Sequence, residues 1–125
     1  MEENISVKLN STKQYIEGHY KGLITTEIGI ELVQSVIDAI EEYKCRRILF
    51  DASEAFSSAT TAENFEFALQ MSKMLEKLGD FRWAVYYKND PHMYEMVYNM
   101  IVQSGITNYF MTKDRAIALK WLLDI

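Results

Sequence analysis

The residues of this sequence that could carry acid–base or metal chemistry are few and widely separated. Its two histidines are His19 and His92, and its single cysteine is Cys45. A metal site needs ligands at short spacings such as His-x-x-x-His or Cys-x-x-Cys, and the sequence has neither. We therefore expect no metal and no cofactor, and we interpret these three residues as structural positions.

Asp51 stands apart from the other carboxylates. Most of them, such as Glu63 and Glu66, fall on the solvated faces of expected helices, whereas Asp51 ends the short apolar run 47–51. A run of this kind is typical of a strand buried on both faces in a parallel sheet, and α/β proteins place ligand sites at the ends of such strands. Two roles follow for Asp51: capping the amides of the next loop, or serving a site at that edge.

Known catalytic motifs are missing from the sequence. No glycine-rich phosphate loop follows an expected strand, and no Gly-x-Ser-x-Gly elbow is present. An enzyme would have to combine Asp51, a histidine and a hydroxyl from segment 57–61 within about 3 Å of one another, or across one water. We therefore expect a protein that is not an enzyme.

Charge and hydropathy exclude further classes of function. The 125 residues carry a net charge of −5, which repels phosphate backbones, so we expect no nucleic-acid partner. The longest apolar stretch, 83–87, is far shorter than the ~20 residues of a membrane span, and the acidic start at 1–4 does not resemble a secretory signal. We expect a cytoplasmic protein without a membrane span.

The elements that must position these residues alternate between strand and helix periodicity. The order ββαβαβαβα predicts an α/β fold in which four helices accompany a mostly parallel sheet of about five strands, as a single domain over 1–125. Cap residues mark the helix starts: Thr25 or Thr26, Thr60 with Glu63, Asp90 before Pro91, and Thr112. The expected strands are 5–9, 14–20, 47–51, 82–88 and 108–111, with a loop at 52–59.

Helical spacing also predicts which side chains face the core. The first helix should bury Ile28, Leu32, Val33, Val36, Ile37 and Ile40. The second should bury Phe65, Leu69, Ser72, Leu75 and Leu78, the third Met93, Met96, Val97, Met100 and Ile101, and the last Ala118, Trp121 and Leu122. Tyr94 and Tyr98 then lie beside the methionine stripe of the third helix, one turn apart.

Two segments carry a resemblance to a known family. The strand end Phe50-Asp51-Ala52-Ser53, the Ser/Thr-rich loop and the helix start near Thr60 resemble the centre of a STAS domain, the fold of bacterial anti-sigma-factor antagonists. The ending, 105–112 followed by 114–122, is similar to that of small STAS-like bacterial proteins linked with CRAL-TRIO lipid-binding folds. The resemblance implies a STAS-like domain over nearly the whole chain.

The resemblance also implies site residues. In the antagonists an Asp closes this strand, and a serine nine residues later, preceded by a second Asp, is phosphorylated by a partner kinase. Asp51 matches the first acid and Thr60 the phosphoacceptor, but Ala59 replaces the second Asp, and Thr61 and Ala62 replace the small glycine that follows. Thr60 also has a structural explanation as a helix cap paired with Glu63.

The sequence is rich in methionine and aromatic residues, with seven Met, eight Tyr, six Phe and two Trp. Adaptable Met and amphipathic Tyr are favoured at binding surfaces, although a bulky core accounts for many of them. We expect a non-catalytic regulatory domain that binds a protein partner or itself. The alternative is a carrier of a small apolar ligand or lipid in a pocket near the end of the third strand, beside Phe56, Phe65 and Phe67. The expected binding residues are Asp51, Ser57, Ser58, Thr60, Tyr94 and Tyr98.

Overall fold

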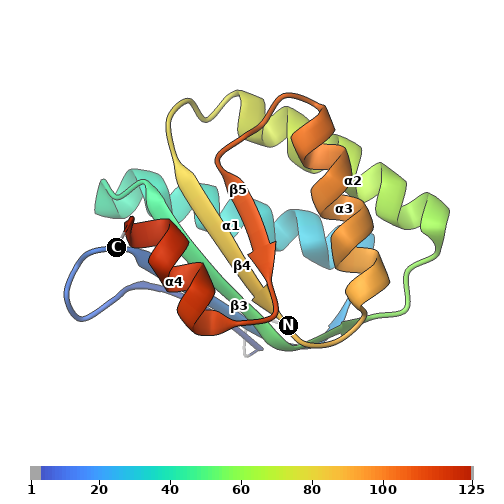
Figure 1. Cartoon of the computed structure of the whole chain (residues 1–125), viewed down its shortest axis with the longest axis horizontal. Coiled ribbons are helices and arrows are strands. Elements are labelled where there is room, and N and C mark those ends of the chain that lie inside the picture. The colour runs from blue at the N-terminus through green and yellow to red at the C-terminus, as the bar shows by residue number, and fades with distance from the viewer. Residues whose placement is uncertain (1–3, 125) are drawn as a thin grey trace.

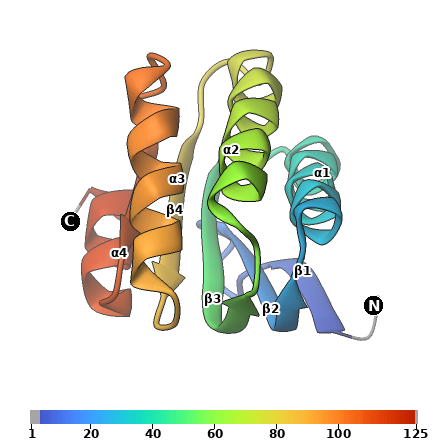
Figure 2. The same cartoon turned by 90° about the vertical axis from the view of Figure 1, so that its right-hand side faces the viewer.

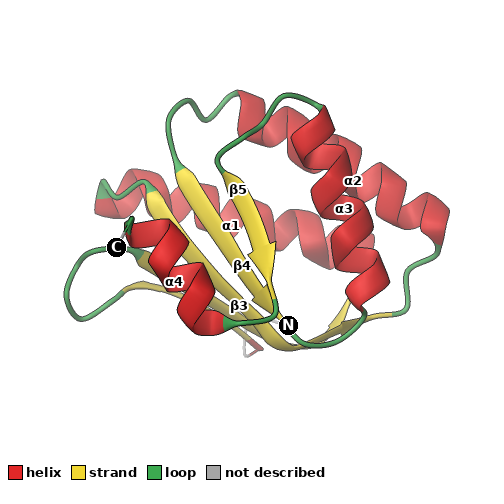
Figure 3. Cartoon of the chain, in the orientation of Figure 1, coloured by secondary structure: helices red, strands yellow, loops and turns green. Residues whose placement is uncertain are grey.

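The structure is a computed structural model that describes residues 4–124. Residues 1–3, which belong to the acidic start, and residue 125 lie outside the described part. The elements follow one another as β1 (Ile5–Leu9), β2 (Ile16–Ile24), α1 (Thr26–Tyr43), β3 (Arg47–Ser57), α2 (Thr61–Glu76), β4 (Arg82–Tyr87), α3 (Pro91–Gln103), β5 (Tyr109–Thr112) and α4 (Arg115–Leu123), as Figures 1 and 3 show. The predicted order ββαβαβαβα is confirmed.

The strands form one mixed sheet in the order β1-β2-β3-β4-β5. β1 pairs antiparallel with β2, and the other three pairings are parallel. Because parallel crossovers are right-handed and this strand order runs in one direction, the connecting helices α1, α2 and α3 must cover the same face. Figure 2 shows α2 lying between α1 and α3. The last helix, α4, has no crossover to complete and packs against β3, β4 and β5 on the other face.

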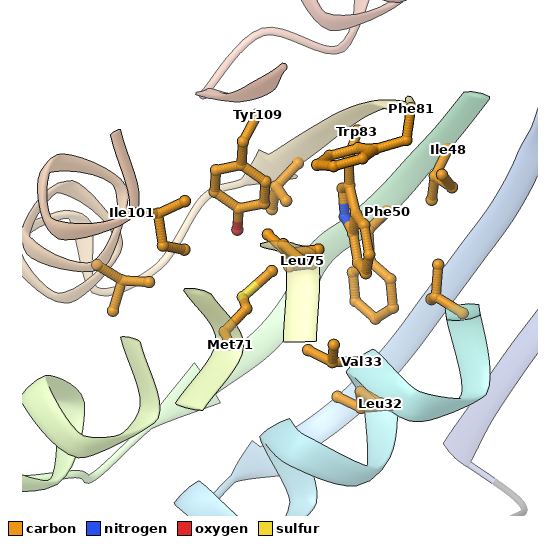
Figure 4. Packing of buried hydrophobic residues seen from close by; sticks show 14 of the residues in the cluster. Leu32, Val33, Ile48, Phe50, Met71, Leu75, Phe81, Trp83, Ile101 and Tyr109 are labelled. Carbon is orange, nitrogen blue, oxygen red and sulfur yellow. The ribbon is translucent and has the colours of Figure 1, made fainter. Parts of the chain in front are cut away.

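The core has a large part beneath α1, α2 and α3 and a small part beneath α4. Neighbouring residues of a strand point to opposite faces, so Ile48 enters the large part and Leu49 the small one, and both are 0% exposed. This confirms that β3 is buried on both faces. In the small part Leu49 packs with Ala118 and Leu122 of α4. Figure 4 shows part of the large one.

β2 begins and ends later than predicted. The side-chain oxygen of Asn10 accepts hydrogen bonds from the backbone N–H groups of Gln14 (2.8 Å) and Tyr15 (3.1 Å). These amides therefore belong to the turn, and pairing with β1 starts where Ile16 meets Leu9. At its other end β2 continues to Ile24 along the parallel ladder with β3.

The loop expected at 52–59 is wrong, because β3 continues to Ser57. The register shifts between His19 and Lys21 of β2, and pairing then resumes from Glu54 to Ser57. This β-bulge gives β3 one extra residue, so that Ala52 and Ala55 can both be buried. The link to α2 is only 58–60.

Three predictions of helix faces and caps also need correction. In α2 the buried residues are Asn64, Ala68, Met71, Ser72 and Leu75, so Ser72 and Leu75 are confirmed, whereas Phe65 and Leu69 are exposed. In α3 they are Tyr94, Val97 and Ile101, with Met93, Met96 and Met100 half-buried. α4 is capped by Asp114, whose carboxylate accepts from the N–H groups of Ala116 (2.9 Å) and Ile117 (3.3 Å), and not by Thr112.

Candidate functional site

Asp51 lies on the α4 face of the sheet and serves the bulge in β3. Its side chain is half-buried, and its Oδ1 accepts a hydrogen bond of 2.9 Å from the N–H of Ser53. A bulge leaves an amide without a ladder partner, so this bond satisfies a donor that the sheet does not use. On the neighbouring strand, His19 is the register partner of Asp51, but its Nε2 lies 2.8 Å from Oε1 of Glu54 instead.

The hydroxyl-rich segment after β3 lies elsewhere, in a hollow between the starts of α2 and α3. We call this hollow of about 300 Å³ the seam pocket. It opens where β3 and β4 end, which is where parallel α/β sheets place their binding sites. Its lining residues are Ser57, Ala59, Thr61, Asn64, Asp90, His92, Met93 and Met96.

Asp90 forms a hydrogen bond to Ser57, another residue that lines the seam pocket. Its Oδ2 accepts a hydrogen bond of 2.7 Å from the backbone N–H of Ser57. Asp90 was expected to cap α3, but its side chain makes no capping bond, and its backbone is left-handed, with φ of 51°. The neighbouring Asn89 donates from Nδ2 to the carbonyl of Ala55 at 3.0 Å. The end of β3 is thus tied to the turn before α3.

Ser57, Asp90 and His92 share this pocket, yet they do not form a catalytic relay. The Asp90 carboxylate bonds the backbone of Ser57, and the Ser57 hydroxyl accepts from the N–H of Ala59 at 3.0 Å. Within residues 4–124, no hydrogen bond joins the His92 ring to Ser57 or Asp90. The same part of the chain contains no group of His, Cys, Asp and Glu arranged to hold a metal ion.

Asn64 is the functional candidate that sequence reasoning missed. Its side chain lines the seam pocket and is 9% exposed. An amide carries both donors and an acceptor, so a group bound in the pocket could form hydrogen bonds with it. The sequence did contain a signal for its burial, because Asn64 lies at helical spacing from Ala68, Met71 and Leu75 and so shares their face of α2.

Two large apolar side chains of α2 are exposed to solvent. Phe65 is 54% and Leu69 is 42% exposed. Phe67, on the same helix, packs against Gly29 of α1. Since successive residues are about 100° apart around a helix, Phe65 and Leu69 lie roughly 160° from Phe67, on the side away from α1. They therefore flank the groove between α2 and α3, which we call the seam.

Two solved structures resemble this chain over nearly its whole length. One is an uncharacterized protein of the DUF3478 family with a SpoIIAA-like fold from Shewanella loihica PV-4, at 17% identity and a TM-score of 0.55, with 94% of this chain and 91% of that chain covered. The other is the anti-sigma factor antagonist SpoIIAA in its unphosphorylated form, at 11% identity and a TM-score of 0.55, with 97% and 99% covered. The chain has a STAS-like fold. No family model and no curated protein matches the sequence.

In this STAS-like fold Thr60, at the expected phosphoacceptor position, is exposed and caps α2. Its Oγ1 accepts from the N–H of Glu63 at 3.1 Å, and its own N–H donates to the Glu63 carboxylate at 2.9 Å, so the predicted capping box is confirmed. The hydrogen bonds from Thr60 lower the pKa of Glu63, because they stabilise its charged form. Ser58 is exposed beside this cap.

The two tyrosines predicted to bind lie away from the seam. Tyr94 is buried and stacks on Tyr87 with 4.7 Å between ring centroids, and Tyr98 is half-buried beside Tyr109 at 6.3 Å. Tyr94 instead faces a second hollow, which we call the core cavity. It measures about 70 Å³ and lies between the sheet and the helices α1, α2 and α3.

No helix within residues 4–124 is both long and apolar enough to cross a membrane.

Proposed function

We propose that this STAS-like chain is a non-catalytic regulatory protein of the bacterial cytoplasm that binds a partner protein over the seam between α2 and α3. The observation that carries the proposal is the exposure of Phe65 and Leu69 on the side of α2 that faces away from α1. The antagonist SpoIIAA, by its name, acts on another protein, and it shares this fold. The absence of catalytic motifs from the sequence is consistent with a binding role.

The seam has the composition of a protein-binding surface. Burying a Phe or Leu side chain stabilises a complex by about 1.5–3 kcal/mol, and half-buried Met93 and Met96 can adapt to different partners. The amide of Asn64, which lines the pocket, supplies both a donor and an acceptor. A partner can thus gain apolar contact at the rim and a directional hydrogen bond below it.

Charge indicates which partner surface fits. The whole chain carries a net charge of −5. An apolar patch surrounded by lysine and arginine complements this negative charge and speeds the encounter of the two proteins. We therefore infer a partner with a basic docking face.

Thr60 is a candidate control point for that interaction. A phosphate on its exposed hydroxyl would remove the cap acceptor and place a second negative charge beside Glu63. The amides at the start of α2 would still attract the phosphate, so the two effects oppose each other. Ser57 and Ser58 belong to the same segment, whereas Asp51 lies on the other face of the sheet and takes no part in this proposal.

The proposal can be tested by photo-crosslinking in the native host. A photoreactive amino acid at position 65 should capture a discrete protein, identified by mass spectrometry, whereas the same amino acid at position 117 should not. Ile117 is the matched control, because it is 50% exposed but lies on α4. The purified partner should then bind the Phe65→Asp, Leu69→Asp double variant at least tenfold more weakly than wild type and bind Ile117→Asp normally. Equal binding of both variants would refute the seam as the interface.

Self-association is the competing use of the same surface. Sedimentation velocity of the purified chain distinguishes the two cases. A dimer that Phe65→Asp dissociates and Ile117→Asp leaves intact would assign the seam to a second copy of this chain.

A second candidate function is the binding of a small apolar ligand. Phe56 and Phe65, which were expected to line its pocket, are 50% and 54% exposed, whereas Phe67 lines the core cavity. The size of that cavity, about 70 Å³, favours a small molecule over a lipid.

A further inference from the structure

The turn before α3 places a carboxylate at the wall of the seam pocket. Asp90 is half-buried and lines the pocket, and its Oδ2 accepts the hydrogen bond of 2.7 Å from Ser57, which lines the pocket as well. An ionised carboxylate has about four acceptor positions, and this bond occupies one of them. Among the described residues that line the pocket, Asp90 is the only acidic one. The pocket therefore holds one negative charge that can accept further hydrogen bonds.

This charge has no counterion within residues 4–124. The ion pairs of that part of the chain use the carboxylates of Glu17, Glu41 and Glu54. The nearby Lys88 is exposed, and its ammonium lies 5.9 Å from the ring centroid of Tyr86. An ion pair is stronger in a partly desolvated pocket than in open water, so Asp90 favours a cation that enters the pocket from outside.

The helix starts beside the pocket do not reverse this preference. Free N–H groups at a helix start attract an anion, but several of these are bonded within the chain. The N–H groups of Met93 and Tyr94 donate to the carbonyl of Asp90 at 3.1 and 3.3 Å. At the start of α2, the N–H of Glu63 donates to the hydroxyl of Thr60. Because the Asp90 carboxylate also repels a second anion, the pocket favours a cation over a phosphate or a carboxylate.

The other walls of the pocket select the kind of cation. Met93 and Met96 offer flexible apolar contact to a methylene stem. The amide oxygen of Asn64 is an acceptor besides the carboxylate. A guanidinium presents its N–H donors in a planar fork that can meet a carboxylate and a further oxygen together, whereas the ammonium of lysine is a compact point charge. Arginine therefore fits this lining better than lysine.

The volume of the pocket is sufficient for such a side chain. A cavity of about 150 Å³ takes up benzene, and an arginine side chain has one non-hydrogen atom more than benzene. The seam pocket, at about 300 Å³, is roughly twice as large. An arginine can thus enter it and leave room for water.

We propose that the seam pocket receives an arginine side chain of the partner protein, with the guanidinium paired to Asp90 and the stem along Met93 and Met96. This inference rests on the proposed function, because it assigns one specific contact within the seam. It makes Asp90 the residue that selects the partner by charge, while exposed Phe65 and Leu69 supply apolar contact.

The pocket can be tested without the partner. Nα-acetyl-arginine methylamide is the probe, and the corresponding citrulline compound, which has nearly the same shape but no charge, is its matched control. In nitrogen–proton correlation spectra at constant ionic strength, the arginine compound should shift the backbone signal of Ser57 to a saturable limit and leave that of Ile117, on α4, unchanged. It should bind at least about tenfold more tightly than the citrulline compound, because a charge-assisted hydrogen bond is stronger than a neutral one.

Asp90→Asn removes the charge and keeps an acceptor for the N–H of Ser57, so the fold should be retained, as circular dichroism can verify. This variant should bind the arginine compound as weakly as wild type binds the citrulline compound. The inference is overturned by a Ser57 shift that grows linearly with concentration, by equal affinities for the two compounds, or by unchanged arginine binding in Asp90→Asn. Equally tight binding of Nα-acetyl-lysine methylamide would overturn the choice of arginine.

The partner captured through position 65 separates this inference from the proposed function. That protein should bind Asp90→Asn at least about tenfold more weakly than wild type. Equal binding would overturn the arginine contact and leave the seam as the interface. A saturable arginine site in a chain that captures no protein at position 65 would instead support the chemistry of the pocket and refute the partner.

Discussion

The carboxylate of Asp90, in the turn before α3, accepts a hydrogen bond of 2.7 Å from the backbone N–H of Ser57, the last residue of β3. Asp90 adopts a left-handed backbone conformation to do so, with φ of 51°. This bond joins two residues that line the seam pocket and holds the end of β3 against the turn before α3.

Asp90→Ala should therefore destabilise the protein by about 2 kcal/mol, since it removes an acceptor from a partly buried N–H and leaves at positive φ a residue that tolerates this conformation less well than aspartate. Asp90→Asn is the matched control, because asparagine keeps an acceptor oxygen and tolerates this conformation. Urea denaturation measures the effect, and hydrogen exchange at Ser57 should accelerate only in the alanine variant. Similar stability of both variants would contradict this role of the carboxylate.

Thr60→Ala should cost about 1 kcal/mol of stability, because it removes the hydroxyl that caps the N–H of Glu63 at the start of α2. Thr60→Ser keeps that oxygen and should remain close to wild type. Ser58→Ala, in the same exposed segment, is a second control. If Thr60→Ala and Ser58→Ala unfold at the same urea concentration as wild type, the capping box contributes nothing measurable.

The effect of Gly29→Ala on stability should change sign with the residue at position 67. A Cβ on Gly29 would lie 2.7 Å from a ring carbon of Phe67, a distance at which the ring must move. In wild type we expect a net loss of about 1 kcal/mol, because the clash outweighs the helix propensity that alanine adds. In a Phe67→Ala background the same change should stabilise by about 1 kcal/mol. Additive effects in a double-mutant cycle would show that the two residues do not interact.

Alkaline pH should unfold the protein through its buried tyrosines. Burial raises the pKa of Tyr94 and Tyr109 above the ordinary value of 10.0. The stability that these two protonated hydroxyls contribute is therefore fully present below pH 10. It is lost as the pH rises above 10, because the unfolded chain releases protons that the folded chain retains. Each should reduce the free energy of unfolding by about 1.4 kcal/mol per pH unit above about pH 10.

Denaturant titrations between pH 8 and pH 11 measure this slope. Tyr94→Phe and Tyr109→Phe should each make it shallower, whereas Tyr86→Phe, at a half-buried position, controls for the substitution itself. A free energy of unfolding that stays constant up to pH 11 would be inconsistent with burial of these hydroxyls.

Local patterns in the sequence determined the elements and their order. The Thr60 and Glu63 pair predicted the start of α2, because a capping box depends only on residues three positions apart. The apolar run containing Ile48 and Leu49 predicted a strand buried on both faces. With right-handed crossovers, this order led to a mostly parallel sheet.

The tertiary structure decided which side chains reach the two candidate sites. In α2, Phe65 with Leu69 and Asn64 with Ala68 both have helical spacing, and only the fit of the helix between α1 and α3 turns Asn64 inward and Phe65 outward. The length of β3 depended on its ladder with β2, a partner distant in sequence.

Trp83 and Tyr94 meet at one cavity because β4 and α3 pack across the core, and no local pattern records that contact. Periodicity specifies a stripe on a helix or a face of a strand, but the rotation of that stripe is set by neighbours that only the folded chain brings together.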